Sequence, residues 1–253
     1  TPPLPDSPTL HPLLGQQIPS PVSPTKYHTQ ISTQYPTYLT DHRVFGQAIL
    51  PATAYLEIAL SAGATTKRSH QQITLTNISI QRGLILKEQE NATLQTVLTK
   101  KENNAQQFQI FSQDTSNPDE ANSQWICHAI GTLQISEDSI PAPIDLEACK
   151  ANFLQTVPVQ TYYQKLRDRG LEYGPDFQAI QQLWAAPNQA LGEIILPETL
   201  SISGYQLHPV LLDACFQTLA AAIGETKLAA HTYLPSGIEK LSIYAPISNR
   251  VWT

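Results

Sequence analysis

The feature of this sequence that most constrains its fold is a segment that predicts a helix buried on every side. In residues 208–223 (HPVLLDACFQTLAAAI) apolar side chains occupy the whole circumference of the expected helix, and such a helix must lie inside the protein. Residues 51–63 (PATAYLEIALSAG) predict a second apolar helix, which begins at a proline and ends at a glycine. The fold therefore has to enclose both helices.

Strand-like segments surround both predicted helices. From about residue 71 to 135, polar and apolar residues alternate in several short runs, including Leu84 and Leu86, which predicts an antiparallel sheet. A helix is predicted at 159–169. Further strand-like runs follow it at 178–184, 190–196 and 238–244. We interpret the chain as two related α+β units, in each of which a sheet wraps around one buried helix.

Prolines and polar residues mark the expected divisions of the chain. The first 24 residues contain eight prolines, a density that excludes helix and predicts an extended lead-in. Residues 136–145 (SEDSIPAPID) are polar and contain prolines, which is typical of a linker. We therefore expect an N-terminal unit with its lead-in at 1–140, a linker at 141–158 and a C-terminal unit at 159–253.

Charge and composition exclude several classes of protein. The chain has 15 basic and 21 acidic side chains and a net charge of -6, so we expect no binding to nucleic acid. No apolar run approaches the roughly 20 residues of a membrane helix, so we expect no membrane partner. Three widely separated cysteines predict neither disulfides nor a metal site. The chain begins at Thr1 without a targeting segment, and we expect a cytoplasmic piece of a longer polypeptide.

Asp213 is a carboxylate within the apolar helix predicted at 208–223. Burying a carboxylate without a partner is costly, and burial raises its pKa. Gln217 follows four residues later and so lies on the same face of the helix. The residues alone leave two interpretations open: a carboxylate that caps or pairs with a neighbouring strand, or a proton donor.

His42 precedes the helix predicted at 51–63, and nothing around it has metal-ligand spacing. An isolated histidine is often structural, but a neutral imidazole can also accept a proton. Gly46 would let the backbone approach a ligand, and the free N–H groups after Pro51 could hold a developing oxyanion. A base, an acid and an oxyanion site together suit removal of a proton next to a carbonyl, with loss of a β-substituent as water.

Several motifs occur in a fixed order along the chain. They are His42, Gly46 and Pro51 (HxxxGxxxxP), Tyr173–Gln178 (YGPDFQ), Leu207–Gln217 (LHPVLLDACFQ), His11–Gly15 (HPLLG) and Tyr233–Ile238 (YLPSGI). Together they resemble the dehydratase domains of modular polyketide synthases and of animal-type fatty acid synthases. The similarity runs from about residue 11 to 252, which is nearly the whole chain.

The resemblance implies an α+β double hot-dog fold, in which two antiparallel sheets each wrap around a central helix and the active site lies between the halves. By similarity, His42 is the base that removes the α-proton, and Asp213 is the acid that protonates the departing β-hydroxyl. Gln217 would orient Asp213.

The same resemblance implies further roles and partners. Tyr173 and Gly174 would bind or orient the substrate, as would Pro51, and the backbone of Gly46 would hold the thioester carbonyl. The substrate would be a 3-hydroxyacyl chain on the phosphopantetheine of an acyl carrier protein, and no metal or cofactor of the chain's own is expected. The other expected partners are further domains of the same megasynthase and a second copy in a homodimer. Because the chain stops at Thr253, we expect the second hot dog to be truncated at its end.

Three alternatives remain beside dehydration. Domains that only shift a double bond resemble this family but depart at the aspartate or the motif proline, whereas Asp213 and Pro51 are both present. A thioesterase would need its own water-activating carboxylate. A non-catalytic module that docks a carrier protein or holds a dimer together would have lost His42 or Asp213.

Overall fold

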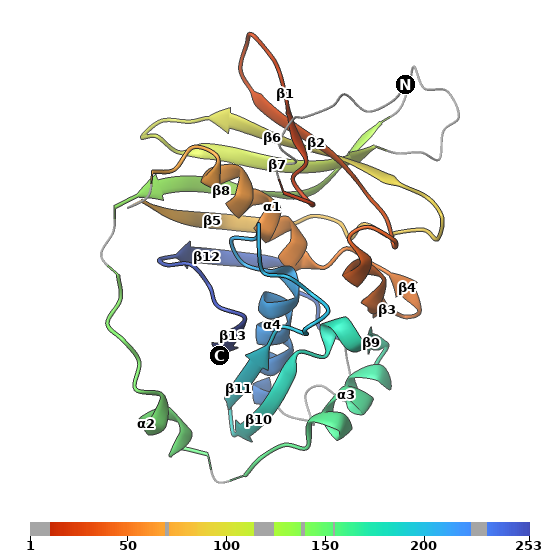
Figure 1. Cartoon of the computed structure of the whole chain (residues 1–253), viewed down its shortest axis with the longest axis vertical. Coiled ribbons are helices and arrows are strands. Elements are labelled where there is room, and N and C mark those ends of the chain that lie inside the picture. The colour runs from red at the N-terminus through yellow and green to blue at the C-terminus, as the bar shows by residue number, and fades with distance from the viewer. Residues whose placement is uncertain (1–10, 69–70, 114–123, 138–139, 154, 224–231) are drawn as a thin grey trace.

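A computed structural model describes residues 11–68, 71–113, 124–137, 140–153, 155–223 and 232–253. Within these ranges the largest element is a seven-stranded antiparallel sheet (Figure 1). In their order across the sheet, the strands are β1 (Gln16–Ile18), β2 (Thr25–Ile31), β6 (Ala92–Lys100), β7 (Gln106–Gln113), β8 (Trp125–Ser136), β5 (Gln72–Ile80) and β12 (Gly237–Ile243).

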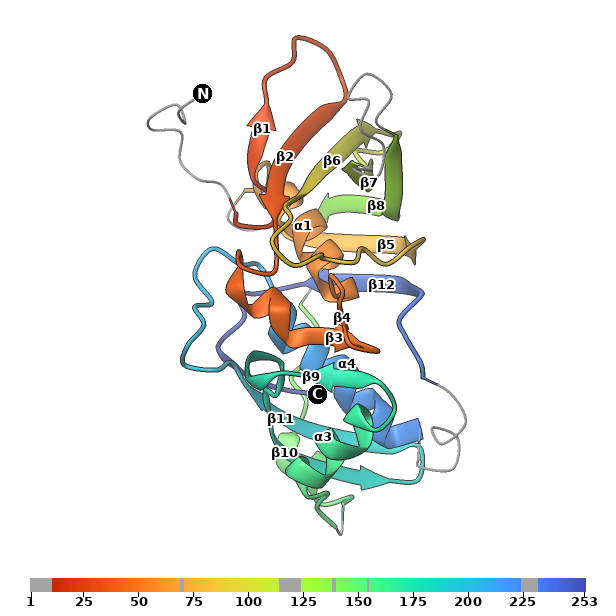
Figure 2. The same ribbon diagram turned by 90° about the vertical axis from the view of Figure 1, so that its right-hand side faces the viewer.

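The first predicted helix is confirmed as α1 (Ala52–Ala64), which packs against β5 and β8. Every residue from Thr53 to Gly63 is buried, because the sheet curves around the helix (Figure 2). The alternation in the sequence has the expected effect in β7, where Phe108, Ile110 and Ser112 are buried and their neighbours are partly exposed. The buried side chains of the strands therefore form one side of the core, and α1 packs against them.

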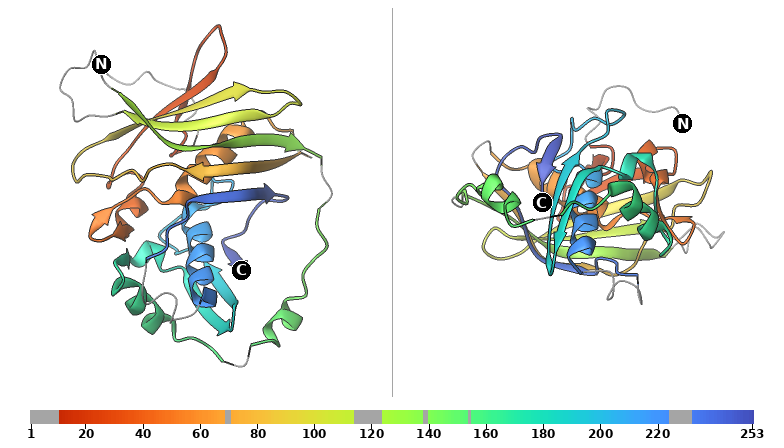
Figure 3. Two further views of the ribbon diagram at one scale, coloured as in Figure 1. Left: turned by 180° about the vertical axis from the view of Figure 1, so that it is seen from behind. Right: turned by 90° about the horizontal axis from the view of Figure 1, so that it is seen from below.

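The second predicted helix is confirmed as α4 (Pro209–Ile223), which lies alongside β10 (Ile180–Ala186) and β11 (Gln189–Ile195) (Figure 3). The strand β13 (Arg250–Trp252) pairs with the other edge of β11. The two buried helices also touch each other, and apolar side chains of both belong to one continuous core. This arrangement is the one expected of a double hot dog.

A small sheet joins the two halves beside these helices. The strand β3 (His42–Val44) pairs with β4 (Gln47–Ala48) on one side and with β9 (Leu171–Tyr173) on the other. The remaining described helices are short: the 3-10 turns η1 (Thr37–Asp41) and η3 (Pro175–Phe177), and the α-helices α2 (Leu146–Lys150) and α3 (Val159–Arg167).

Some local expectations differ from the structure. The strand β12 lies in the predicted C-terminal unit, yet it pairs with β5 and forms the edge of the N-terminal sheet. Periodicity predicts a strand but not its partner, so the sheets do not follow the expected units. The boundaries at 1–140, 141–158 and 159–253 remain a prediction.

Two further segments also form contacts that the sequence pattern does not specify. The proline-rich lead-in is not a free arm where it is described, because β1 and β2 form a hairpin on the edge of the large sheet. Residues 1–10 lie outside the described part of the chain. Leu84 and Leu86 form no strand of the sheet: their backbone atoms bond to Leu50 and Ala48, in the segment that leads into α1.

Candidate active site

His42 is carried by a tight hairpin between β3 and β4. The two residues at its turn, Phe45 and Gly46, have φ angles of 48° and 76°, which is the left-handed pair of a type I′ turn and explains the glycine. The Gly46 N–H donates to Glu172 Oε1 over 2.8 Å, and Gly46 itself is exposed. Gly46 therefore shapes the turn, and its N–H already has a carboxylate partner in this structure.

The imidazole of His42 is buried and held in one orientation. Its Nδ1 lies 2.8 Å from the carbonyl oxygen of Ile49, and because a carbonyl only accepts, Nδ1 carries the proton. In the neutral imidazole the Nε2 atom then has a free lone pair, and it lies 3.9 Å from Asp213 Oδ1. The ring also packs 5.2 Å from Phe177, centroid to centroid. The hairpin and its neighbours thus present an unprotonated nitrogen to the carboxyl group.

The side chain of Asp213 approaches His42 from α4, in the other half of the chain. The residue is only 6% exposed, and its Oδ2 accepts a 2.9 Å hydrogen bond from Gln217 Nε2, one turn later in the helix. Burial raises the pKa of the Asp213 carboxyl above its ordinary value, while the nearby His42 and the hydrogen bond from Gln217 act in the opposite direction. The arrangement favours a carboxyl group that keeps its proton to higher pH than usual.

Tyr163 on α3 orients Gln217, a role that was not expected from the sequence. Its hydroxyl donates to Gln217 Oε1 over 3.0 Å and accepts from the N–H of Ile180 over 3.2 Å. Because Gln217 Nε2 also donates to the carbonyl of Phe177, both ends of this amide are assigned. A tyrosine in an amphipathic helix gives no signal of such a role, since core packing explains it equally well.

The other predicted site residues take different positions. Tyr173 stands opposite His42 on β9, with 5.7 Å between the ring centroids, and burial raises the pKa of its hydroxyl. Gly174 lies against Asp41, whose carboxylate would stand within 2.6 Å of any Cβ at this position. Pro51 is the residue at the start of α1. The structure therefore brings together His42, Tyr173, Asp213 and Gln217, while Gly46, Pro51 and Gly174 shape the backbone around them.

The remaining titratable groups in the described ranges do not assemble into a metal site. No cluster of three metal-ligating side chains occurs among the described residues, and Cys127, Cys149 and Cys215 are all free thiols. In the described part of the chain, no helix has the length and apolar character needed to cross a membrane. His128 is buried between Ser112 and the carbonyl of Arg82, away from the pair of catalytic candidates.

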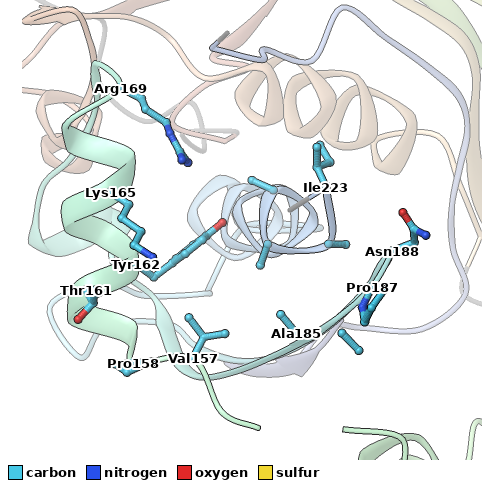
Figure 4. Close-up of a pocket in the computed structure, with 14 residues that line it drawn as sticks. Val157, Pro158, Thr161, Tyr162, Lys165, Arg169, Ala185, Pro187, Asn188 and Ile223 are labelled. Carbon is cyan, nitrogen blue, oxygen red and sulfur yellow. The ribbon is translucent and has the colours of Figure 1, made fainter. Parts of the chain in front are cut away.

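A cavity of about 520 Å³ lies at the far end of α4 (Figure 4). Lys165, Arg169 and Tyr162 extend into it from α3 and the turn after it, and alanines of α4 and β10 line its apolar wall. Neither His42 nor Asp213 lines this cavity. Tyr162 lines this cavity and also contacts a site residue, because its hydroxyl donates to the backbone oxygen of Gln217.

Both halves of the chain match families of known proteins. Residues 11–113 match the polyketide synthase dehydratase domain, and residues 141–253 match a family described as the polyketide synthase dehydratase N-terminal domain. Among longer relatives, mycoketide-CoA synthase of Mycobacterium tuberculosis is 29% identical over 238 residues, which are 93% of this chain and 5% of that protein. Erythronolide synthase EryA2 of Saccharopolyspora erythraea is 30% identical over 217 residues, which are 85% of this chain and 6% of that protein. The chain thus spans a small part of these relatives.

Solved structures resemble the chain over almost its whole length. The dehydratase domain from the CurK module of curacin polyketide synthase has a TM-score of 0.88 and 38% identity, and the match covers 96% of this chain and 85% of that one. Two inactive variants of the CurK dehydratase match equally well; in one an aspartate is replaced by asparagine, and in the other a histidine by phenylalanine. These comparisons confirm the double hot-dog fold, and in this chain a buried histidine and aspartate face each other from its two halves. The chain belongs to the family of polyketide synthase dehydratase domains.

Proposed function

We propose that the chain dehydrates a 3-hydroxyacyl thioester to a 2,3-enoyl thioester during polyketide synthesis, with the acyl chain carried on the phosphopantetheine of an acyl carrier protein. The observation that carries this proposal is the pair of His42 Nε2 and Asp213 Oδ1, buried and 3.9 Å apart. Elimination of water needs a base and an acid close to adjacent carbon atoms, and this pair supplies both groups.

The tautomer and the pKa direction assign the two roles. His42 Nε2 has a free lone pair and takes the proton from C2 of the thioester. The raised pKa of Asp213 favours its protonated form, which gives a proton to the hydroxyl at C3 as the C–O bond breaks. One enoyl thioester and one water leave, and the pair then holds a protonated imidazole and a carboxylate. Transfer of one proton from His42 to Asp213, directly or through water, restores the starting state.

Relatives support the same assignment. In the CurK dehydratase, one inactive variant replaces an aspartate and another replaces a histidine. The two replaced positions are separated in that chain by nearly the same number of residues as His42 and Asp213 are in this one. By analogy with the longer synthases, the partners would be a carrier protein and the neighbouring domains of one polypeptide.

The direct test is turnover of a 3-hydroxyacyl pantetheine thioester by the purified 253-residue chain. We expect a product lighter by one water, the absorbance of a conjugated enoyl thioester, and rehydration when the enoyl compound is supplied instead. If the chain only shifted the double bond of an enoyl thioester, it would be an isomerase. If it released free acid and thiol, it would be a thioesterase. Either result without loss of water would contradict the proposal.

Tyr163→Phe tests the positioning of the acid. The variant loses the hydrogen bond to Gln217 Oε1, which is worth about 1 kcal/mol, so we expect kcat to fall about fivefold while KM stays unchanged. Tyr162→Phe is the matched control, because the hydroxyl of Tyr162 donates to the backbone oxygen of Gln217 and not to its side chain. Equal kcat values for the two variants would show that Tyr163 has no positioning role.

A further inference from the structure

Glu57 is a carboxylate in the middle of the buried helix α1, and the reaction does not use it. Its side chain is 0% exposed, so its two oxygens need hydrogen-bond partners from the protein rather than from water. Ser61 Oγ, one turn later in the same helix, donates to Oε1 over 2.8 Å. Two distant segments of the chain also reach this carboxylate: one donates two backbone N–H groups to it, and the other places a histidine ring beside it without a hydrogen bond.

One of these segments is the turn that begins with His11. Its Nε2 lies 3.0 Å from Glu57 Oε1. Its Nδ1 faces the backbone N–H groups of Leu13 and Leu14, at 3.1 and 3.4 Å, so Nδ1 is an acceptor and the proton is on Nε2. The HPLLG motif therefore places a neutral N–H group beside the buried carboxylate.

The other segment leads directly into α4. The N–H of Gln206 donates to Glu57 Oε1 and the N–H of Leu207 donates to Oε2, both over 2.8 Å. His208 and Pro209 follow at once, and Pro209 is the first residue of α4. Burial lowers the pKa of His208 to about 3, so this imidazole stays neutral at the start of α4.

Each catalytic group is connected to Glu57 through hydrogen bonds and one of the two buried helices. His42 bonds to the carbonyl of Ile49, two residues before the residue at the start of α1, and Glu57 lies on that helix. Asp213 lies on α4, whose entry is held by the same carboxylate through two backbone N–H groups. A shift of the start of α4 would therefore change the separation of His42 and Asp213 directly.

We propose that Glu57 is a positioning residue that couples α1 to the start of α4 and keeps Asp213 opposite His42. The inference rests on the proposed dehydration for its kinetic readout. His11 lies 3.0 Å from the same carboxylate and is itself only 7% exposed, but its Nε2 makes no hydrogen bond there. The carboxylate acts through the helix and never touches the substrate.

Glu57→Gln tests this role. The amide has nearly the same size, but its NH₂ group faces backbone N–H donors and leaves one of them without an acceptor. Since displacement of a reacting group by about 1 Å can cost about 100-fold in rate, we expect kcat to fall about 10- to 100-fold, with KM changed less than about twofold. Should E57Q fail to fold, Glu57→Asp keeps the carboxyl group, is one methylene shorter, and is expected to show the same drop in kcat.

Ser61→Ala is the matched control. It removes a donor to the same carboxylate but none that reaches α4, so thermal stability should fall while kcat stays within about twofold of the parent. A folded E57Q or E57D protein with the kcat of the parent would overturn the positioning role. So would S61A losing as much kcat as E57Q, because Glu57 would then act only through stability.

A structural readout separates this inference from the proposed function. Crystal structures of E57Q and S61A should show the His42 Nε2 to Asp213 Oδ1 distance lengthened beyond 3.9 Å in E57Q only. If the parent chain does not remove water, the proposed function is wrong, and this distance still decides the role of Glu57. An unchanged distance in E57Q would overturn it.

Discussion

Asp213→Asn is expected to reduce dehydration by about 10² to 10⁴-fold, because the asparagine amide cannot supply a proton to the departing hydroxyl. The geometry should otherwise persist. The asparagine oxygen can still accept from Gln217 Nε2, and its NH₂ group would take the place of Oδ1, which lies 3.9 Å from His42 Nε2. Initial rates with a 3-hydroxyacyl pantetheine thioester, at saturating substrate, measure the loss.

The same variant should also be more stable than the parent at neutral pH. Burial raises the pKa of Asp213, so the folded state favours the protonated form, and the parent loses stability as pH rises from the ordinary carboxyl pKa through the raised one. D213N has no such dependence. Its melting temperature should match the parent near about pH 4 and exceed it at neutral pH.

Asp168→Asn provides the control for both measurements. Asp168 is an exposed carboxylate at the end of α3 that accepts a hydrogen bond from Gln164 and, within the described part of the chain, forms no hydrogen bond or ion pair with His42 or Asp213. Its replacement should change neither the rate nor the pH dependence of stability. If D213N kept the parent's rate, Asp213 would not be the acid. If D213N were less stable than the parent at neutral pH, the carboxyl pKa of Asp213 would not be raised in the folded state.

His42→Gln is expected to lose dehydration by a similar factor, about 10² to 10⁴-fold, because glutamine cannot accept a proton from carbon. The reverse reaction should fail as well, so the variant should not incorporate deuterium at C2 of the thioester in D₂O, whereas the parent should. Mass spectrometry of the recovered thioester measures this exchange independently of water loss. Normal exchange at C2 in H42Q would show that another group is the base.

A double variant and a second histidine complete this test. Because His42 and Asp213 act on one elimination, H42Q/D213N should be little slower than the slower single variant. Multiplicative losses would instead indicate independent roles. His128→Gln is the matched control: His128 is also buried and bonds to a backbone carbonyl through Nδ1, so its loss should lower stability but leave turnover unchanged.

Much of the local structure followed from residue patterns. The helices expected at 51–63 and 208–223 are α1 and α4, displaced by no more than one residue at either end, since both are marked by prolines and by continuous apolar sequence. The alternation in residues 71–135 corresponds to β5, β6, β7 and β8. Such patterns are readable because they reflect interactions between residues that are close in the chain.

The site was predictable only in part. His42, Asp213 and Gln217 could be named from their motifs, and the expected bond between Gln217 and Asp213 follows from their spacing of four residues on a helix. Gly46 was expected at a ligand, but its N–H bonds to Glu172, which is 126 residues away in sequence. Tyr163 and Glu57 gave no sequence signal, because a tyrosine or a glutamate within a helix fits many roles.

The sequence by itself thus determined which segments are helices and strands and which side chains have the chemistry for elimination. Tertiary structure alone decided that β12 extends the sheet of the other half and that His42 and Asp213 stand 3.9 Å apart. It also decided that one buried carboxylate, Glu57, joins the two helices behind them. The physical reason is range: periodicity and capping depend on neighbours within a few residues, whereas pairing across more than a hundred residues depends on how the whole core packs.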